Sequence, residues 1–155
     1  MANRLKAEIQ QTRPFLSAGE EAFLNLQRTA GLQFQSLARF LKPFDLTPTQ
    51  YNVLRILRGA LPGSLPSGEV GTRMVTPEPD VTRLLDRLES RGLIRRSREN
   101  TDRRVVRARL EGAGLELLAR LDEPIHEFLS ALTSPLDGAQ QSQLIELLER
   151  LRTGD

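Results

Sequence analysis

Arginine is concentrated in one stretch of the sequence, RGLIRRSRENTDRRVVRARL, which runs from residue 91 to residue 110. Eight of these 20 residues are arginine, although the formal net charge of the 155-residue chain is only +2. The guanidinium group stays charged at every physiological pH, and its planar fork of donors matches the oxygens of phosphate. This composition favours a surface that binds a polyanion. The alternative is a solvated basic surface without a partner.

The net charge also changes sign along the chain. It is +3 over residues 1–79, +5 over residues 80–110 and −6 over residues 111–155. A basic middle next to an acidic end indicates one surface for a polyanion and other surfaces for other contacts.

Other kinds of chemistry find little support in the sequence. The absence of cysteine excludes disulfides, thiolate metal sites and thiol redox sensing. His126 is the only histidine and lies in a helical apolar pattern, so we expect a histidine at the edge of the core rather than a catalytic or metal-binding one. No Gly-rich phosphate loop, nucleophile elbow or paired-histidine motif occurs. We therefore expect no enzyme activity, no cofactor and no metal.

Neither a membrane segment nor a secretion signal is evident. No apolar run approaches the roughly 18 residues of a membrane span, and the N-terminal residues MANRLKAEIQ lack the apolar core of a signal peptide. We expect a cytoplasmic protein with no membrane partner.

The spacing of apolar residues predicts two helices well before the arginine-rich stretch. One covers residues 17–42, with apolar residues three and four apart. The next covers residues 48–59, where Thr47 and Gln50 fit a capping box. Residues 60–66, with their prolines and glycine, predict a loop.

Two shorter helices should follow. A short helix fits residues 67–74 with Ser67 as its N-cap, and a longer helix then opens with Thr76 as its N-cap. Pro77 and Pro79 would fall in the first turn of that helix, where backbone amides have no intrahelical acceptor to lose. One face of this helix is apolar and the other is polar.

The arginine-rich stretch itself predicts a β-hairpin with a basic tip. Residues 93–97 and 105–110 have strand composition, and RENTD between them has turn composition. Two more helices follow, the last with a second capping box at Asp137 and Gln140. We expect this last helix to bury a row of leucines, namely Leu144, Leu147, Leu148 and Leu151.

This order of elements indicates a helix-turn-helix with an attached hairpin, or wing. A helix fits the major groove of DNA, and an arginine-tipped hairpin fits the minor groove, where the potential is negative. The recognition-helix candidates are Thr76, Glu78, Pro79, Asp80, Thr82, Arg83 and Arg87. The wing candidates are Arg96, Arg98, Thr101, Asp102, Arg103 and Arg104, and the helix starts at Thr47 and Ser67 are candidates for phosphate contacts.

Some of these arginines could instead have roles that do not involve reading a DNA sequence. Arg83 and Arg87 could pair with Asp80 and Asp86 along the helix, a contribution of only a few tenths of a kcal/mol per pair. Arg95, Arg107 and Arg109 lie on strand faces and would add attraction to phosphate without reading sequence.

Three motifs in this order resemble the MarR family of winged-helix transcriptional regulators: LTPTQYNVLRIL, VTRLLDRLESRGLIRR and the sequence DRR at residues 102–104. The resemblance extends over residues 20–151. It implies a homodimer that binds a palindromic operator, usually as a repressor released by a small ligand. It also implies that Asp102 orients the tip formed by Arg103 and Arg104. One departure is Leu110-Glu111, where the family usually has Leu-Thr.

The resulting fold class is mainly α with a small β-hairpin wing. We expect one MarR-like chain, residues 1–155, with a winged helix-turn-helix over residues 46–110 and dimerisation helices over residues 15–42 and 111–152. The dimer would also bury apolar seams that the small DNA-binding core cannot cover.

The resemblance further implies a ligand pocket between the DNA-binding core and the dimerisation helices. Its candidate residues are Arg39, Phe40, Tyr51, Arg55 and His126, a set suited to an aromatic carboxylate. The alternative is that Tyr51 and Phe40 are core residues and Arg39 a surface residue. For the whole protein, the alternative function is a winged-helix module that binds proteins rather than specific DNA.

Overall fold

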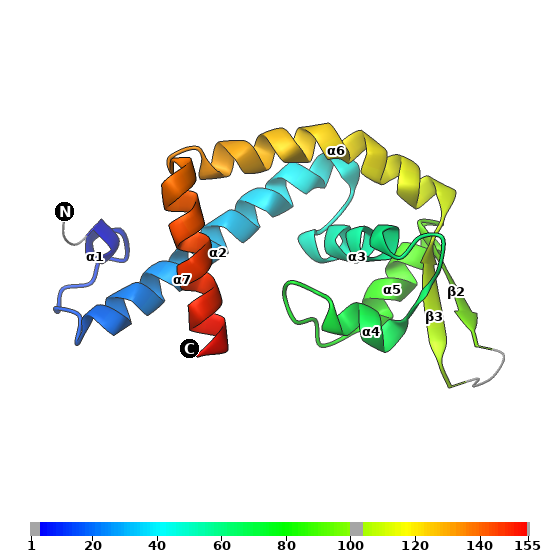
Figure 1. Cartoon of the computed structure of the whole chain (residues 1–155), viewed down its shortest axis with the longest axis horizontal. Helices are drawn as coiled ribbons and strands as arrows, with labels where there is room; N and C mark the ends of the chain where they lie inside the picture. Colours follow the sequence, from blue (N-terminus) through cyan, green and yellow to red (C-terminus); the bar gives the residue numbers. More distant parts are fainter. Residues whose placement is uncertain (1–3, 100–103, 155) are drawn as a thin grey trace. The chain divides into compact units, whose positions relative to one another are not determined.

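The computed structural model describes residues 4–99 and 104–154. The chain forms two compact units, Met1–Pro48 and Thr49–Asp155, and each is described by itself. Figure 1 shows the ribbon and the element labels. Within the described residues, no helix is both long enough and apolar enough to cross a membrane.

The first unit is helical. It contains the short helix α1 (Arg4–Glu8), the long helix α2 (Ala18–Leu41) and the 3-10 helix η1 (Lys42–Phe44). The Ser17 hydroxyl caps α2 by accepting a hydrogen bond from the amide of Glu20 at 3.1 Å. The predicted stop before Pro43 is confirmed, since α2 ends at Leu41 and the chain then tightens into η1.

The second unit begins with a helix-turn-helix and a small sheet. Its elements are α3 (Pro48–Gly59), β1 (Leu65–Pro66), α4 (Ser67–Thr72), α5 (Val81–Ser90), β2 (Ile94–Arg98) and β3 (Val106–Leu110). The sheet is antiparallel with the strand order β1-β3-β2, and Ala108 of β3 pairs with Leu65 on one side and Arg96 on the other. The hairpin is therefore confirmed, but the prediction of a loop over residues 60–66 is wrong at its end. Two residues are too few to show a strand period, and the pairing with β3 decides their conformation.

The two short helices begin differently from the prediction. Helix α5 starts at Val81, and Asp80 rather than Thr76 is its N-cap, with the carboxylate accepting from the amide of Arg83 at 2.9 Å. Pro77 and Pro79 lie before the helix, because each proline pushes the residue before it out of the helical region. Ser67 is not a cap but the first residue of α4, and its hydroxyl donates to the carbonyl of Val106 at 2.9 Å.

Two helices, α6 (Gly112–Thr133) and α7 (Gly138–Thr153), complete the second unit. Helix α7 has the predicted capping box at Asp137 and Gln140, whereas Glu111 at the start of α6 makes no side-chain cap, as the missing threonine predicts. The leucines of α7 are not buried within the chain: the exposed fractions of Leu144, Leu147 and Leu151 are 44%, 46% and 71%.

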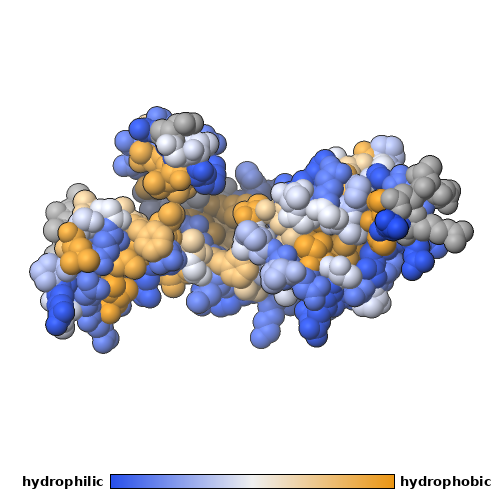
Figure 2. All heavy atoms as spheres, turned by 90° about the horizontal axis from the view of Figure 1, so that it is seen from below, coloured by the Kyte–Doolittle hydropathy of each residue, from blue (hydrophilic) through white to orange (hydrophobic). Residues whose placement is uncertain are grey.

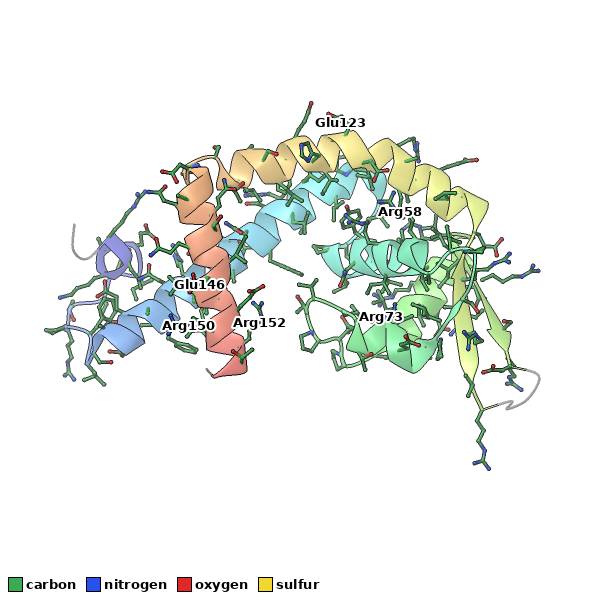
Figure 3. All side chains as sticks on the ribbon, in the orientation of Figure 1. Arg58, Arg73, Glu123, Glu146, Arg150 and Arg152 are labelled. Atoms are coloured by element: carbon green, nitrogen blue, oxygen red, sulfur yellow. The ribbon has the colours of Figure 1, made fainter. Side chains whose placement is uncertain are left out.

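Core residues come from every element of the winged region and from α6. They include Val53, Leu54 and Leu57 of α3, Leu65 of β1, Val70 of α4, Leu84, Leu85 and Leu88 of α5, Ile94 and Ala108 of the hairpin, and Leu117, Leu118, Leu121 and Ile125 of α6. The start of α6 approaches the residue before β2 so closely that a Cβ atom on Gly114 would lie 2.3 Å from the carbonyl oxygen of Leu93. Figure 3 shows Arg58 of α3 extending toward α6, where it pairs with Asp122 at 2.9 Å.

Candidate nucleic-acid interface

Helix α5 has one buried face and one exposed face. Its three leucines lie in the core, while Thr82, Arg83 and Arg87 are exposed. The pairing of Arg83 and Arg87 with neighbouring aspartates does not form, because Asp80 caps the helix and Asp86 binds Arg96. Among the described residues, none forms an ion pair with Arg83 or Arg87. The side chains of Arg83 and Arg87 are therefore available to an anionic partner outside the chain.

The segment before α5 carries the other predicted recognition residues. Thr76 and Pro79 are exposed and Glu78 is half-buried. This segment is tied to α3 by the side chain of Asn52, which accepts a hydrogen bond from the amide of Val75 at 2.9 Å. We did not predict this role of Asn52, because a contact between residues 23 positions apart has no local sequence signal.

The arginines of the hairpin fall into two groups. Arg95, Arg98 and Arg104 are exposed. Arg107 is half-buried and holds the chain before β1, with its Nε donating to the Ser64 hydroxyl at 2.9 Å and a terminal nitrogen to the Ser64 carbonyl at 2.6 Å. The predicted tip residues Thr101, Asp102 and Arg103 lie outside the described residues.

Arg96 also has a structural environment. Glu89 accepts from its backbone amide at 2.7 Å and from its Nε at 2.8 Å, and Asp86 accepts from a terminal guanidinium nitrogen. The hydrogen bond from the Arg96 amide, followed by that from its side chain, holds the pKa of Glu89 below its usual value. Burial alone would lower the pKa of Arg96, but its hydrogen bonds to Glu89 and Asp86 outweigh burial and raise it.

Glu89 was not among the predicted site residues. A signal for it exists in the sequence, since an acidic side chain near the C-terminal end of a helix opposes the helix dipole. Such a residue beside a basic hairpin indicates a cationic partner elsewhere in the fold, here Arg96.

A cavity of about 400 Å³ lies where α4, α5 and the hairpin meet. Its polar lining comes from Ser67, Thr82, Arg96 and Arg104. The Thr82 hydroxyl and the Arg104 guanidinium suit an anion such as a backbone phosphate, whereas the Arg96 guanidinium is already bound by Asp86 and Glu89. The hydroxyl proton of Ser67 is already donated to Val106, so the Ser67 side chain would act on a phosphate only as an acceptor. Thr47, the other predicted phosphate contact, is exposed directly before α3.

The predicted ligand-pocket residues are divided between the two units. In the first unit, Arg39 is exposed and donates to Ser36, and the ring of Phe40 lies 6.0 Å from that of Phe44. In the second unit, Tyr51 is buried and Arg55 donates to its hydroxyl at 2.9 Å. The pocket stays a prediction.

His126 is exposed on α6, so the expectation of a core-edge histidine is wrong. The face of α6 that packs inward passes through Leu121 and Ile125, and His126 lies one residue further round the helix. Among the described residues, no group of three histidine or acidic side chains is arranged to hold a metal ion.

Comparison with known proteins matches the winged helix-turn-helix region to one family. A model described as the MarR family matches residues 44–105. The chain is 32% identical to the HTH-type transcriptional regulator YkoM of Bacillus subtilis, over 84% of this chain and 86% of the relative. It is 28% identical to the HTH-type transcriptional repressor IacR of Pseudomonas putida, over 82% and 75% of the two chains.

Solved structures agree with this match. A MarR transcription factor from Planctomyces limnophilus is 37% identical, with a TM-score of 0.69 over 88% of this chain and 98% of the other. Sco3205 of Streptomyces coelicolor, in complex with DNA, has a TM-score of 0.82 at 22% identity over 93% and 92% of the two chains.

BpsR of Bordetella bronchiseptica, whose DNA binding is described as regulated by 6-hydroxynicotinic acid, has a TM-score of 0.76 at 22% identity, over 86% and 99% of the chains. At 22% identity, the likenesses to Sco3205 and BpsR establish the fold alone. With the helix-turn-helix, the basic hairpin and the 32% identical regulator taken together, the chain belongs to the MarR family of DNA-binding transcriptional regulators, which are not enzymes.

Proposed function

We propose that this protein binds a palindromic operator as a homodimer and represses transcription, with α5 in the major groove and the hairpin in the minor groove. The observation that carries the proposal is the exposed face of α5, where Arg83 and Arg87 have no ion-pair partner among the described residues. A protein with this target works where the genome is, so the proposal keeps the expectation of a cytoplasmic location.

Sequence reading is assigned to α5. Thr82, Arg83 and Arg87 are exposed on a helix whose opposite face is locked into the core by Leu84, Leu85 and Leu88. Arginine donates two parallel hydrogen bonds to guanine, and each such contact contributes about 1–3 kcal/mol of discrimination against another base. Thr76, Glu78, Pro79 and Asp80 lie just before the helix or at its cap and would adjoin the groove wall.

The hairpin is assigned to the DNA backbone and the minor groove. Arg98 at the end of β2 and Arg104 just before β3 are exposed, and Thr101, Asp102 and Arg103 keep their predicted roles at the tip. The cavity beside Thr82 and Arg104 would hold a backbone phosphate. Contacts of this kind position the protein without reading sequence.

Exposed apolar side chains support the homodimer. Figure 2 shows that hydrophobic side chains reach the surface in patches as well as singly. On α2, Phe23, Leu26, Leu32 and Phe34 have exposed fractions between 41% and 57%, and on α7 four apolar residues lie between 44% and 71%. Monomeric proteins rarely expose such rows, and burial contributes about 25 cal/mol per Å². A two-fold dimer would in turn require a palindromic operator.

Repression and release by a ligand are proposed from two relatives and from one pair of side chains. IacR is named a repressor, and the DNA binding of BpsR is described as regulated by 6-hydroxynicotinic acid. Arg55 next to the ring of Tyr51, with the guanidinium carbon 5.8 Å from the ring centre, suits the charge and face of an aromatic carboxylate. We propose an aromatic carboxylate as the effector class.

The test is fluorescence anisotropy with DNA from the region upstream of the gene and with random DNA of the same length, over a series of salt concentrations. Arg83→Ala/Arg87→Ala should abolish the preference for upstream DNA, and Arg103→Ala/Arg104→Ala should weaken binding. Arg120→Ala, which removes a charge from an exposed position on α6, is the matched control and should change little.

Steep loss of binding with salt is expected, because each phosphate contact releases counterions. If the wild-type protein binds upstream and random DNA equally, the operator assignment is wrong and a protein-interaction module becomes the better reading. Adding benzoate or 6-hydroxynicotinate to the bound complex tests the effector class separately.

A further inference from the structure

Three charged side chains form a cluster between α5 and β2. They are Asp86 and Glu89 of α5 and Arg96 of β2, and only 20% of the Arg96 side chain is exposed. Glu89 binds Arg96 twice, through the backbone amide at 2.7 Å and through Nε at 2.8 Å. In Figure 1, α5 and the hairpin lie next to each other, so this cluster joins the two parts of the interface.

The charge of Arg96 is compensated locally. Two carboxylates surround one guanidinium, so the cluster carries one net negative charge and adds no attraction for phosphate. Arg95 and Arg98 on the same strand are exposed, and among the described residues neither of the two side chains has a hydrogen bond or ion pair. Arg96 therefore differs from its neighbours in burial and in the partners that its side chain binds.

We propose that Glu89 and Asp86, through Arg96, fix the hairpin at one angle to α5, so that recognition helix and wing are arranged for DNA before binding. This inference rests on the proposed function. Arg96 is a positioning residue, since a hairpin free to swing would lose conformational freedom on binding and lower the affinity. The lowered pKa of Glu89 agrees with a carboxylate held ionised by its partner.

Removing a carboxylate tests the proposal, because electrostatic attraction and positioning predict opposite changes in the affinity for the operator. Glu89→Gln and Asp86→Asn each delete a negative charge, so simple electrostatics predicts tighter binding to every DNA. Positioning predicts that affinity for the operator falls about tenfold, the effect of one hydrogen bond to a charged group, while random DNA is bound as before or more tightly. Glutamine still accepts from the Arg96 amide, which preserves the fold.

The salt dependence separates positioning from phosphate contact. The plot of log K against log salt has a negative slope, and loss of one phosphate contact reduces the magnitude of this slope by about 0.9. Arg96→Gln should lower operator affinity with an unchanged slope. Arg95→Gln, one residue away on the exposed face of β2, is the matched control and should lower affinity for all DNA together with the slope.

A measurement without DNA tests the geometry directly. The chain contains no cysteine, so spin labels on Arg87→Cys and Arg98→Cys report the distance between α5 and the hairpin within a protomer. Glu89→Gln should broaden this distance distribution, and Arg95→Gln should leave it unchanged.

Equal tightening on operator and random DNA in the carboxylate variants would overturn the proposal, as would an unchanged label distance in Glu89→Gln. A lower slope in Arg96→Gln would instead make Arg96 a phosphate contact. Failure of the proposed function is distinguishable from failure of the positioning role, because the wild-type protein would then show no preference for the operator. The label distances would still test the positioning role in that case.

Discussion

Replacing Gly114 with alanine should strongly destabilise the protein. Gly114 lies in the first turn of α6, and a Cβ atom there would be 2.3 Å from the carbonyl oxygen of Leu93 and 2.7 Å from the Cδ1 atom of Leu110. A carbon and a carbonyl oxygen normally approach no closer than about 3.3 Å. The start of α6 would have to move by about 1 Å away from β2.

The cost follows from what resists this movement. The nearest atom is a backbone oxygen that also accepts a hydrogen bond from the amide of Glu111 at 3.1 Å. Overpacking a core costs about 1–3 kcal/mol, and weakening this hydrogen bond adds about 1 kcal/mol. We expect a loss of about 3 kcal/mol, a large part of the 5–15 kcal/mol that stabilises a typical domain.

Urea unfolding at fixed protein concentration measures this loss, because dimerisation would make stability depend on concentration. Gly112→Ala is the matched control on the same helix, since nothing lies within 4 Å of its Cβ position. It should stabilise the protein by about 0.5 kcal/mol through the unfolded state. If Gly114→Ala unfolds within 0.5 kcal/mol of the wild type, the close packing of α6 on β2 is refuted.

Three further predictions concern the dimer, the acid sensitivity and an ion pair. Leu147→Asp on α7 should convert the dimer to a monomer at micromolar concentration, because it places a charge in a proposed apolar interface; a dimer that persists in light scattering would exclude that part of α7. The ionised form of Glu89 stabilises the fold above its ordinary pKa of 4.5, and this contribution is lost as pH falls through the lowered folded pKa. Glu89→Gln should therefore be less stable than the wild type at neutral pH and should lose less stability than the wild type during acidification, as measured by urea midpoints against pH. For Arg58 and Asp122, whose side chains are 27% and 52% exposed, a double-mutant cycle should give a coupling below about 1 kcal/mol, and a value near 3 kcal/mol would contradict this.

Local signals in the sequence predicted much of the fold. The helix over residues 18–41, the capping box at Asp137 and the hairpin all follow from spacing and caps within a few residues. The start of α5 was predicted wrongly although its signals are also local. Thr76 and Asp80 both have side chains that cap helices well. Because each proline keeps the residue before it out of the helical conformation, the helix begins after Asp80.

The candidate site was predicted as a region rather than residue by residue. Arg95 and Arg96 are identical in type and adjacent, yet one is exposed and the other binds two carboxylates. Their difference depends on the strand register and on Glu89 in another element. Arg107 likewise holds Ser64, which is 43 residues away.

Composition and periodicity alone determined that this chain is helical and has a basic hairpin, because these properties depend on neighbours in sequence; the resemblance to one regulator family came from three motifs in order. Only the tertiary structure decided which arginines remain available for DNA and which hold the fold together. It also decided that the leucines of α7 stay exposed within one chain. The physical reason is that a charge or an apolar side chain acquires its role from the surface it meets, and that surface comes from a distant part of the chain or from a second molecule.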